Sequence, residues 1–257
     1  MKSFGMSSEL STLRRGISIL SALERAAENS NAGWGTSEIA AYLNCDKSQV
    51  SRCLKVLSET GFVERDEITR RYRVSWRLYR LSMRSGHRQL IHASVPLLTT
   101  LAAEIHHRSF LVVRTGLQVL TLWSEAPRDA PVAMRRIGAT APLHTTVVGR
   151  SLMLYWDDRK VREMLRGVSF EGGNQLISSI DDLLRYLKKE KVNGYSIGTA
   201  SNIGAYATLS VPVRISGRTV GAVGVTGDKT KITMRAETVG HTAKAIADKL
   251  SIAARGR

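Results

Sequence analysis

The sequence predicts an α+β protein of two domains, because helix and strand patterns follow one another differently in its two parts. Residues 12–57 carry three apolar stripes of helical spacing, and two strand-like segments follow them. Later in the chain, strand-like segments are interrupted by amphipathic helices. We therefore place a helical domain with a β-hairpin at 1–75, a linker helix at 76–92, and a domain with a mainly antiparallel sheet at 93–257.

The chain carries an excess of positive charge that is concentrated in one segment. Lys and Arg number 38 against 22 Asp and Glu, which gives a formal net charge of +16 over 257 residues. Residues 1–64 hold seven charges of each sign, whereas 65–88 hold eight Arg and two acidic residues. Such a segment suits a polyanionic partner, either nucleic acid or an acidic membrane surface.

A membrane partner finds no further support in the sequence. No stretch approaches the roughly 18 consecutive apolar residues of a spanning helix. The first residues also lack the apolar core of a signal peptide. We therefore expect a cytoplasmic protein without a membrane partner, and nucleic acid is the favoured polyanion.

Three helices are expected in the first domain. The first runs from about Thr12 to Ala27, and Thr36 stands where the N-cap of a second helix is expected. Asn44 tolerates the left-handed backbone of a tight turn, Asp46 can cap the third helix, and Gly61 ends it. Two short helices joined by about three residues, the second of them amphipathic, are typical of a helix-turn-helix motif.

The outward face of the third helix and the segment behind it carry side chains that bond phosphates and base edges. Phe62–Arg65 and Arg70–Val74 read as two short strands around a charged tip, which predicts a β-hairpin wing. Arg70 and Arg71 are expected at this tip, close to backbone phosphates or a minor groove. The predicted DNA-binding residues are Thr36, Lys47, Ser48, Gln49, Ser51, Arg52, Lys55, Arg70, Arg71 and Arg73.

The second domain is expected to contain strands and helices in mixed order. Pro96 would end or kink a helix at 87–106, and Ser216–Gly217 would form the turn of the last hairpin. The spacing of Ser179 and Asp182 predicts a capping box. Strands are expected at about 110–114, 117–123, 132–137, 195–199, 206–213 and 219–226, and helices at 145–155, 158–166, 180–191 and 239–250.

Enzyme classes find no support in the motifs. GxSxG, HExxH, GxxxxGK[ST] and GxGxxG are absent, and Gly221, Gly224 and Gly227 recur every third residue in an apolar strand, which indicates close packing. Cys45 and Cys53 lie eight residues apart without clustered His, so neither a disulfide nor a zinc site is predicted. We expect a non-enzymatic protein without cofactor or metal.

Two other binding classes remain as alternatives. A winged helix that binds protein would not need the basic wing residues Arg70, Arg71 and Arg73. An RNA binder would use aromatic side chains on a sheet, and aromatic residues make up only 6% of the chain.

The segment from Arg14 to Leu81 resembles the IclR family of bacterial transcription regulators, and the resemblance continues into the second domain. In the first domain it rests on Arg15–Leu20, Thr36–Ala40, Lys47–Leu54, Leu57 with Gly61–Val63, and Arg71–Val74. In the second domain it rests on Pro142–Arg150, Gly194–Tyr195, Val211–Val213 and Val220–Gly227.

The resemblance implies a GAF-like second domain that binds a small effector, often an organic or aromatic acid of a catabolic pathway. It also implies a homodimer or homotetramer on a pseudopalindromic double-stranded DNA operator. Where the family often has acidic residues, Cys and Ser, this chain has other side chains, which leaves a degenerate pocket, and with it non-specific DNA binding, as an alternative. The implied effector-binding residues are Thr146, Val147, Gly198, Thr208, Gly224 and Thr226.

Overall fold

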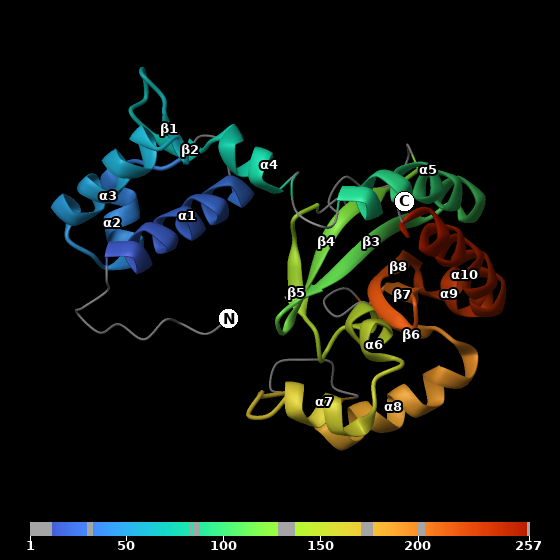
Figure 1. Cartoon of the computed structure of the whole chain (residues 1–257). Coiled ribbons are helices and arrows are strands. Elements are labelled where there is room, and N and C mark those ends of the chain that lie inside the picture. Colours follow the sequence, from blue (N-terminus) through green and yellow to red (C-terminus); the bar gives the residue numbers. More distant parts are fainter. Residues whose placement is uncertain are drawn as a thin grey trace. The chain divides into compact units, whose positions relative to one another are not determined.

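The computed structural model describes residues 12–29, 33–82, 84, 88–127, 137–170, 177–199 and 204–255. The chain divides into two compact units, Met1–Gly86 and His87–Arg257 (Figure 1). The segment predicted as a linker helix, 76–92, includes described helical residues on both sides of 83–87, most of which lie outside the described residues. The helix before them ends at Ser82 in the first unit, and the helix after them begins at Arg88 in the second unit.

The first unit is a helical bundle with a small β-hairpin. Its helices pack around a core that includes Ile19, Ile39, Val50 and Leu54, none of them accessible to solvent. The two strands are antiparallel, which confirms the predicted wing. The elements are α1 (Thr12–Asn29), α2 (Thr36–Leu43), α3 (Lys47–Glu59), β1 (Val63–Arg65), β2 (Tyr72–Val74) and α4 (Trp76–Ser82).

The ends of α2 and α3 are set by local capping. Asn44 adopts the left-handed conformation with a φ of 47°, and the Asp46 carboxylate accepts hydrogen bonds from the first turn of α3, as predicted. The prediction that Thr36 caps α2 is wrong, because Gly35 is the N-cap. The Glu38 carboxylate accepts the Gly35 N–H at 2.7 Å, so a side chain from inside the helix satisfies the N–H of the N-cap residue.

In the second unit, described strands form one antiparallel sheet of six in the order β5-β4-β3-β8-β7-β6. This confirms the predicted α+β class with a mainly antiparallel sheet. The strands are β3 (Arg108–Thr115), β4 (Gln118–Glu125), β5 (Thr140–Pro142), β6 (Ser196–Thr199), β7 (Tyr206–Ile215) and β8 (Arg218–Asp228). The helices are α5 (Arg88–Ile105), α6 (Val147–Met153), α7 (Asp158–Met164), α8 (Ile180–Asn193), α9 (Lys229–Met234) and α10 (Ala236–Ala253).

Helices cover both faces of this sheet (Figure 1). Alternate residues of β7, such as Leu209 and Val211, pack with α5 and α10 in one core. On the opposite face, Phe110 and Val112 of β3 pack with α6, α7 and α8 in a second core. The sheet therefore has two buried faces, and polar groups placed between it and a helix are shielded from solvent.

Several local predictions in this unit are confirmed, one differs, and one falls almost entirely outside the described residues. The turn at Ser216–Gly217 has positive φ at both residues, and Ser179 caps α8. Hydrogen bonds from the Ser178 and Ser179 hydroxyls lower the pKa of Asp182 to about 2. Pro96 lies inside α5 and does not end it. The predicted strand 132–137 falls outside the described residues except for its last residue, which lies in a turn.

The glycine series of β8 packs closely, as its spacing predicts. A methyl group at Gly224 would overlap with the ring of Phe110, and one at Gly227 would lie 2.5 Å from the imidazole of His107. In the parts of the chain that the structure describes, every helix is too short or too polar to cross a membrane.

Candidate DNA-binding surface and effector site

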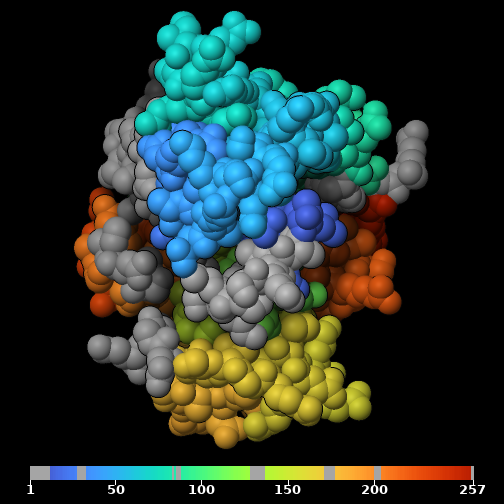
Figure 2. All heavy atoms as spheres, turned by 90° about the vertical axis from the view of Figure 1, so that its left-hand side faces the viewer, coloured from blue at the N-terminus to red at the C-terminus, as the bar shows by residue number. Residues whose placement is uncertain are grey.

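The polar face of α3 forms an exposed surface beside the wing. Lys47, Ser48, Ser51, Arg52 and Lys55 are exposed and Gln49 is half-buried. The opposite face, with Val50, Cys53 and Leu54, belongs to the core. In Figure 2 the surface of α2 and α3 faces the viewer, and the wing tip projects beyond it. The apolar stripe thus holds α3 while its polar side chains remain available to a ligand.

The start of α3 is held by a carboxylate. The Asp46 side chain accepts hydrogen bonds from the backbone N–H groups of Ser48 at 2.8 Å and Gln49 at 3.3 Å. A hydrogen bond from the Ser48 side chain and these backbone donors lower the pKa of Asp46 below 3.8. The carboxylate is therefore ionised at neutral pH and positions the residues that face outward.

The wing tip is also organised by a carboxylate. Asp66 accepts hydrogen bonds from the backbone N–H of Thr69 at 2.7 Å and from its hydroxyl at 2.8 Å, and these lower the pKa of Asp66. Arg70 follows with a positive φ of 59° and an exposed side chain. On the strands, Arg73 pairs with Glu64 at 2.6 Å. Arg70 is thus the wing cation placed at the tip as predicted, whereas Arg73 has a carboxylate partner.

The placement predicted for Arg71 is wrong, because its guanidinium does not extend from the wing tip. Nη1 donates to the carbonyl oxygen of Gly33 at 2.8 Å, and Nη2 donates to Glu38 Oε1 at 3.1 Å. Glu38 thereby joins the wing to the start of α2. Trp34 and Tyr72 add a pair of backbone hydrogen bonds of 2.9 and 2.7 Å between the same segments. Arg71 fastens the wing to the body of the helix-turn-helix.

Sequence reasoning did not single out Glu38 as a site residue. The signal that could have found it is its position three residues after Gly35, because a Glu at the third position of a helix commonly reaches back to the N-cap. Its second partner, Arg71, lies 33 residues away in the sequence. No local sequence pattern predicts a contact between residues so far apart in the chain.

The structure brings most of the implied effector residues together on the sheet face covered by α6. Gly198, Thr208 and Thr226 stand opposite one another on β6, β7 and β8. Gly224 lies two residues further along β8. A methyl group at Gly198 would lie 3.2 Å from Val147 Cγ2 at the start of α6.

Side chains of this protein fill part of that space. The hydroxyl oxygens of Thr208 and Thr226 lie 2.7 Å apart in a hydrogen bond, and the Phe110 ring covers Gly224. Thr146 is committed to the helix, because its hydroxyl accepts the Gly149 N–H at 3.1 Å and donates to the Pro142 carbonyl at 2.9 Å. The Gly149 N–H is therefore not one of the free donors expected there.

A buried ion pair lies beside these residues, and sequence reasoning missed it. Arg150 of α6 and Glu190 of α8 have side chains only 2% and 8% exposed, with Nη2 and Oε1 2.7 Å apart. Arg150 Nη2 also donates to the carbonyl of Ile197 at 2.9 Å, and the Ile197 N–H donates to Glu190 Oε1 at 3.3 Å. The pair thus connects α6, α8 and β6. Its two residues are 40 positions apart, and although Arg150 ends the segment Pro142–Arg150, nothing in the sequence connects it to Glu190.

Two buried hydroxyl groups remain without a partner. Ser151 Oγ on α6 and Ser196 Oγ on β6 make no hydrogen bond with a described residue, and both residues are fully buried. An unsatisfied buried hydroxyl costs about 1–3 kcal/mol. Such groups call for a water or ligand atom as partner.

A winged helix-turn-helix unit followed by a helix-covered antiparallel sheet defines a class of two-domain transcription regulators. The family model described as "IclR helix-turn-helix domain" matches residues 12–67, and "Bacterial transcriptional regulator IclR C-terminal" matches residues 84–252. The chain therefore belongs to the IclR family of bacterial transcriptional regulators, as the resemblance in its sequence predicts. It is a transcription regulator with a DNA-binding helix-turn-helix and a C-terminal effector domain.

Named relatives are regulators and not enzymes, in agreement with the motif analysis. The glycerol operon regulatory protein of Streptomyces coelicolor is 28% identical over 195 residues, which cover 75% of this chain and 76% of the relative. The HTH-type transcriptional repressor AllR of Salmonella typhi is 23% identical over 252 residues, which cover 93% and 90%.

Solved structures share the fold. An IclR transcriptional regulator from Alicyclobacillus acidocaldarius has a TM-score of 0.79 at 21% identity and covers 96% of this chain and 99% of its own. An IclR homolog from Microbacterium hydrocarbonoxydans, complexed with 4-hydroxybenzoate, has a TM-score of 0.81 at 19% identity, with coverage of 95% and 99%.

Proposed function

We propose that this protein binds a pseudopalindromic DNA site as a homodimer or homotetramer, with α3 of two protomers in successive major grooves. The exposed polar face of α3, opposite a fully buried apolar stripe, carries this proposal. Exposed apolar side chains on α1 and α4, among them Leu13 at 75% and Trp76 at 74%, support a contact between protomers.

Within this proposal the residues divide into two groups. Gln49 and Arg52 read base edges, because Gln pairs with adenine and Arg with guanine in the major groove. Lys47, Lys55 and Arg70 neutralise phosphates, and Ser48, Ser51 and the first turn of α2 at Thr36 add neutral contacts. Arg71 and Arg73 are left out of the phosphate contacts, since carboxylates hold them at 3.1 and 2.6 Å, whereas the exposed Lys55 is 3.9 Å from Glu59.

The salt dependence of binding tests this assignment. If Lys47, Lys55 and Arg70 each neutralise one phosphate, two protomers make six contacts, and log K should fall against log salt with a slope near −5. The matched control Lys249→Gln removes one charge from α10 and should leave the slope unchanged. A slope near −2 would contradict the proposal.

Sequence specificity needs a separate measurement. Sheared genomic DNA retained on the purified protein at physiological salt should be enriched in one short pseudopalindrome. Retention without a common site would favour the alternative, a non-specific DNA-binding protein with a degenerate effector pocket.

We further propose that the effector is a small organic or aromatic acid, held between the start of α6 and strands β6–β8. The unpaired hydroxyls of Ser151 and Ser196 support a polar ligand on this face. The 4-hydroxybenzoate bound to the Microbacterium homolog supports an acid of this class. Movement of the Phe110 ring or the Thr208 and Thr226 side chains would open the space that they now fill.

A thermal-shift panel of carboxylic acids that includes 4-hydroxybenzoate tests the effector proposal. A binding acid should raise the unfolding temperature, and Thr226→Val should weaken that rise while the control Thr99→Val, on the exposed face of α5, should not. If none of the acids shifts the unfolding temperature, the pocket is degenerate.

A further inference from the structure

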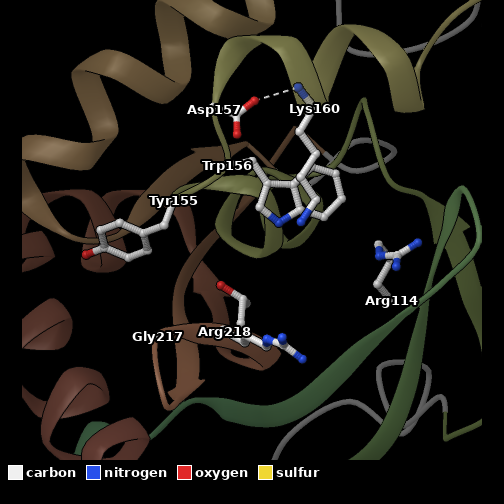
Figure 3. Close-up of a pocket in the computed structure, with 8 residues that line it drawn as sticks. Arg114, Tyr155, Trp156, Asp157, Lys160, Gly217 and Arg218 are labelled. Carbon is white, nitrogen blue, oxygen red and sulfur yellow. Dashed lines mark hydrogen bonds between the residues drawn. The ribbon is translucent and has the colours of Figure 1, made fainter.

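A pocket lies in the second unit, away from the implied effector residues. It has a volume of about 500 Å³ and is formed where the β3–β4 hairpin, the α6–α7 loop and the β7–β8 hairpin meet (Figure 3). Its side chains include Arg114, Trp156, Lys160 and Arg218. Figure 3 shows Arg218 across the open space from the Trp156 ring, with Arg114 at the side.

The strand register separates this pocket from the effector residues. Thr226 stands opposite Arg108 on β3, and Arg114 lies six residues further along that strand. At about 3.3 Å per residue, this places the pocket roughly 20 Å from Thr226 along the sheet. Helix α6 lies between the two places, with Val147 at its start and Trp156 shortly after its end.

The pocket collects positive charges that form no ion pair with a described carboxylate. Lys160 Nζ lies 4.4 Å from the centroid of the Trp156 ring, and Arg114 Cζ lies 5.6 Å from it. Arg114 Nη1 donates to the Gly116 carbonyl at 2.9 Å, which leaves further guanidinium donors. The backbone of Arg218 pairs with Ile215 in the hairpin, but its guanidinium makes no hydrogen bond or ion pair with a described residue.

The one acidic residue of the pocket does not offset these charges by an ion pair. Asp157 Oδ1 accepts the backbone N–H of Lys160 at 2.7 Å, as the N-cap of α7. The nearby Asp158 pairs with Lys188, which is not part of the pocket. Three cations therefore face one space with a single carboxylate beside it, and a ligand with several negative charges would complement them.

We propose that this pocket binds a small phosphate ester. Guanidinium groups present parallel N–H donors that match the oxygens of a phosphate, and Arg114 and Arg218 approach the space from two different hairpins. Lys160 adds a third positive charge held against Trp156. A volume of about 500 Å³ is larger than a single ion needs and lies within the range of metabolite pockets.

Calorimetric titration of the full chain without DNA tests the proposal, with glucose 6-phosphate and inorganic phosphate as probes at constant ionic strength. Glucose 6-phosphate should bind the wild type, and Arg218→Gln should weaken it by at least about tenfold, since a charge-assisted hydrogen bond is worth that factor or more. Lys249→Gln removes the same charge from an exposed site on α10 and should change the affinity less than about twofold. Because no DNA is present, this result is independent of the proposed DNA binding.

Three results would overturn the proposal. The first is the absence of glucose 6-phosphate binding at concentrations up to about 10 mM. The second is an equal loss of affinity in Arg218→Gln and Lys249→Gln, which would indicate a general charge effect. The third concerns the source of the phosphate, because the DNA backbone offers the same group. If Arg218→Gln reduces the salt slope of DNA binding by about one per protomer, the pocket is a DNA contact.

The variant itself is a mild perturbation. Arg218 is exposed at the end of the β7–β8 hairpin, so Arg218→Gln should unfold at the wild-type temperature without ligand. Trp156→Phe offers a second readout. It should remove the change in tryptophan fluorescence that glucose 6-phosphate causes in the wild type while binding persists, and a fluorescence change that survives in Trp156→Phe would contradict the assigned place.

Discussion

An Arg–Glu pair connects distant parts of the chain in each of the two units, and the two pairs differ in exposure. Arg71 and Glu38 in the first unit have side chains that are 37% and 48% exposed, whereas Arg150 and Glu190 in the second are 2% and 8% exposed. Water and salt screen the first pair, which can set the wing position while contributing little to stability. The second pair is shielded, so loss of one partner would strand a buried charge.

The comparison also separates where the two units keep their functional groups. The polar side chains assigned to DNA lie on the surface of α3 and the wing, where water solvates them without a ligand. The polar groups near the implied effector residues are buried between sheet and helix, so each needs a partner inside the protein or in a ligand. Substitutions should therefore change recognition in the first unit and stability in the second.

Breaking the buried pair should have the largest effect. Glu190→Gln leaves the Arg150 guanidinium buried without a counter-charge, and we expect the free energy of unfolding of the second unit to fall by about 3–5 kcal/mol. Hydrogen exchange should accelerate in α6, α8 and β6. Glu59→Gln, which breaks the exposed pair with Lys55, is the control and should cost less than about 1 kcal/mol. An equal loss of unfolding free energy in the two variants would contradict the difference between the buried and the exposed pair.

Gln49→Ala tests recognition at the exposed face of α3. The variant should lose about 1–3 kcal/mol of discrimination at one base pair, while its affinity for random DNA stays nearly unchanged. Competition binding with the enriched site and a set of single-base variants measures this. Equal losses on specific and random DNA would show that Gln49 does not read a base.

Arg71→Gln and Glu38→Gln test whether the exposed pair positions the wing without stabilising the fold. A double-mutant cycle on stability should give a coupling energy of at most about 1 kcal/mol. Arg71→Gln should weaken DNA binding through wing position and leave the salt slope unchanged, whereas Arg70→Gln should reduce the slope by about one per protomer. A slope reduced equally by both variants would assign Arg71 to a phosphate.

Lowering the pH should reduce the stability of the second unit before that of the first. This is the smallest effect that we predict. Burial lowers the pKa of His144 and of His107 below 6.5, so the unfolded state binds more protons and stability falls as the pH drops below 6.5. Hydrogen bonds lower the pKa of Asp46 and Asp66 below 3.8, so the first unit keeps their contribution until the pH falls below 3.8.

Hydrogen exchange of each unit between pH 7 and pH 5 measures this difference. Exchange rates corrected for intrinsic pH dependence should rise in the second unit only, and His144→Gln should reduce that rise. Greater loss of protection in the first unit over this range would contradict the assignment.

Site features that depend on residues close together in the sequence were predicted, whereas features that depend on distant residues were not. The polar face of α3, the Asp46 cap and the Asn44 turn depend on residues within a few positions, and all three are confirmed. The wing itself was predicted from two short strand patterns. The placement of Arg71 was not, because its partners Gly33 and Glu38 come from a loop and helix more than 30 positions earlier.

The sequence by itself determined the class of the protein, most of its helices and strands in their order, and several turns, since periodicity, caps and left-handed residues act locally. The short β5 and α9 were not predicted. Tertiary structure alone decided which charged groups are paired and which remain available. Arg150 and Arg218 show this, because the sequence does not distinguish their electrostatic roles, yet one is buried against Glu190 and the other faces an open pocket. The electrostatic role of a side chain depends on the solvent and partners around it, and those are set by elements distant along the chain.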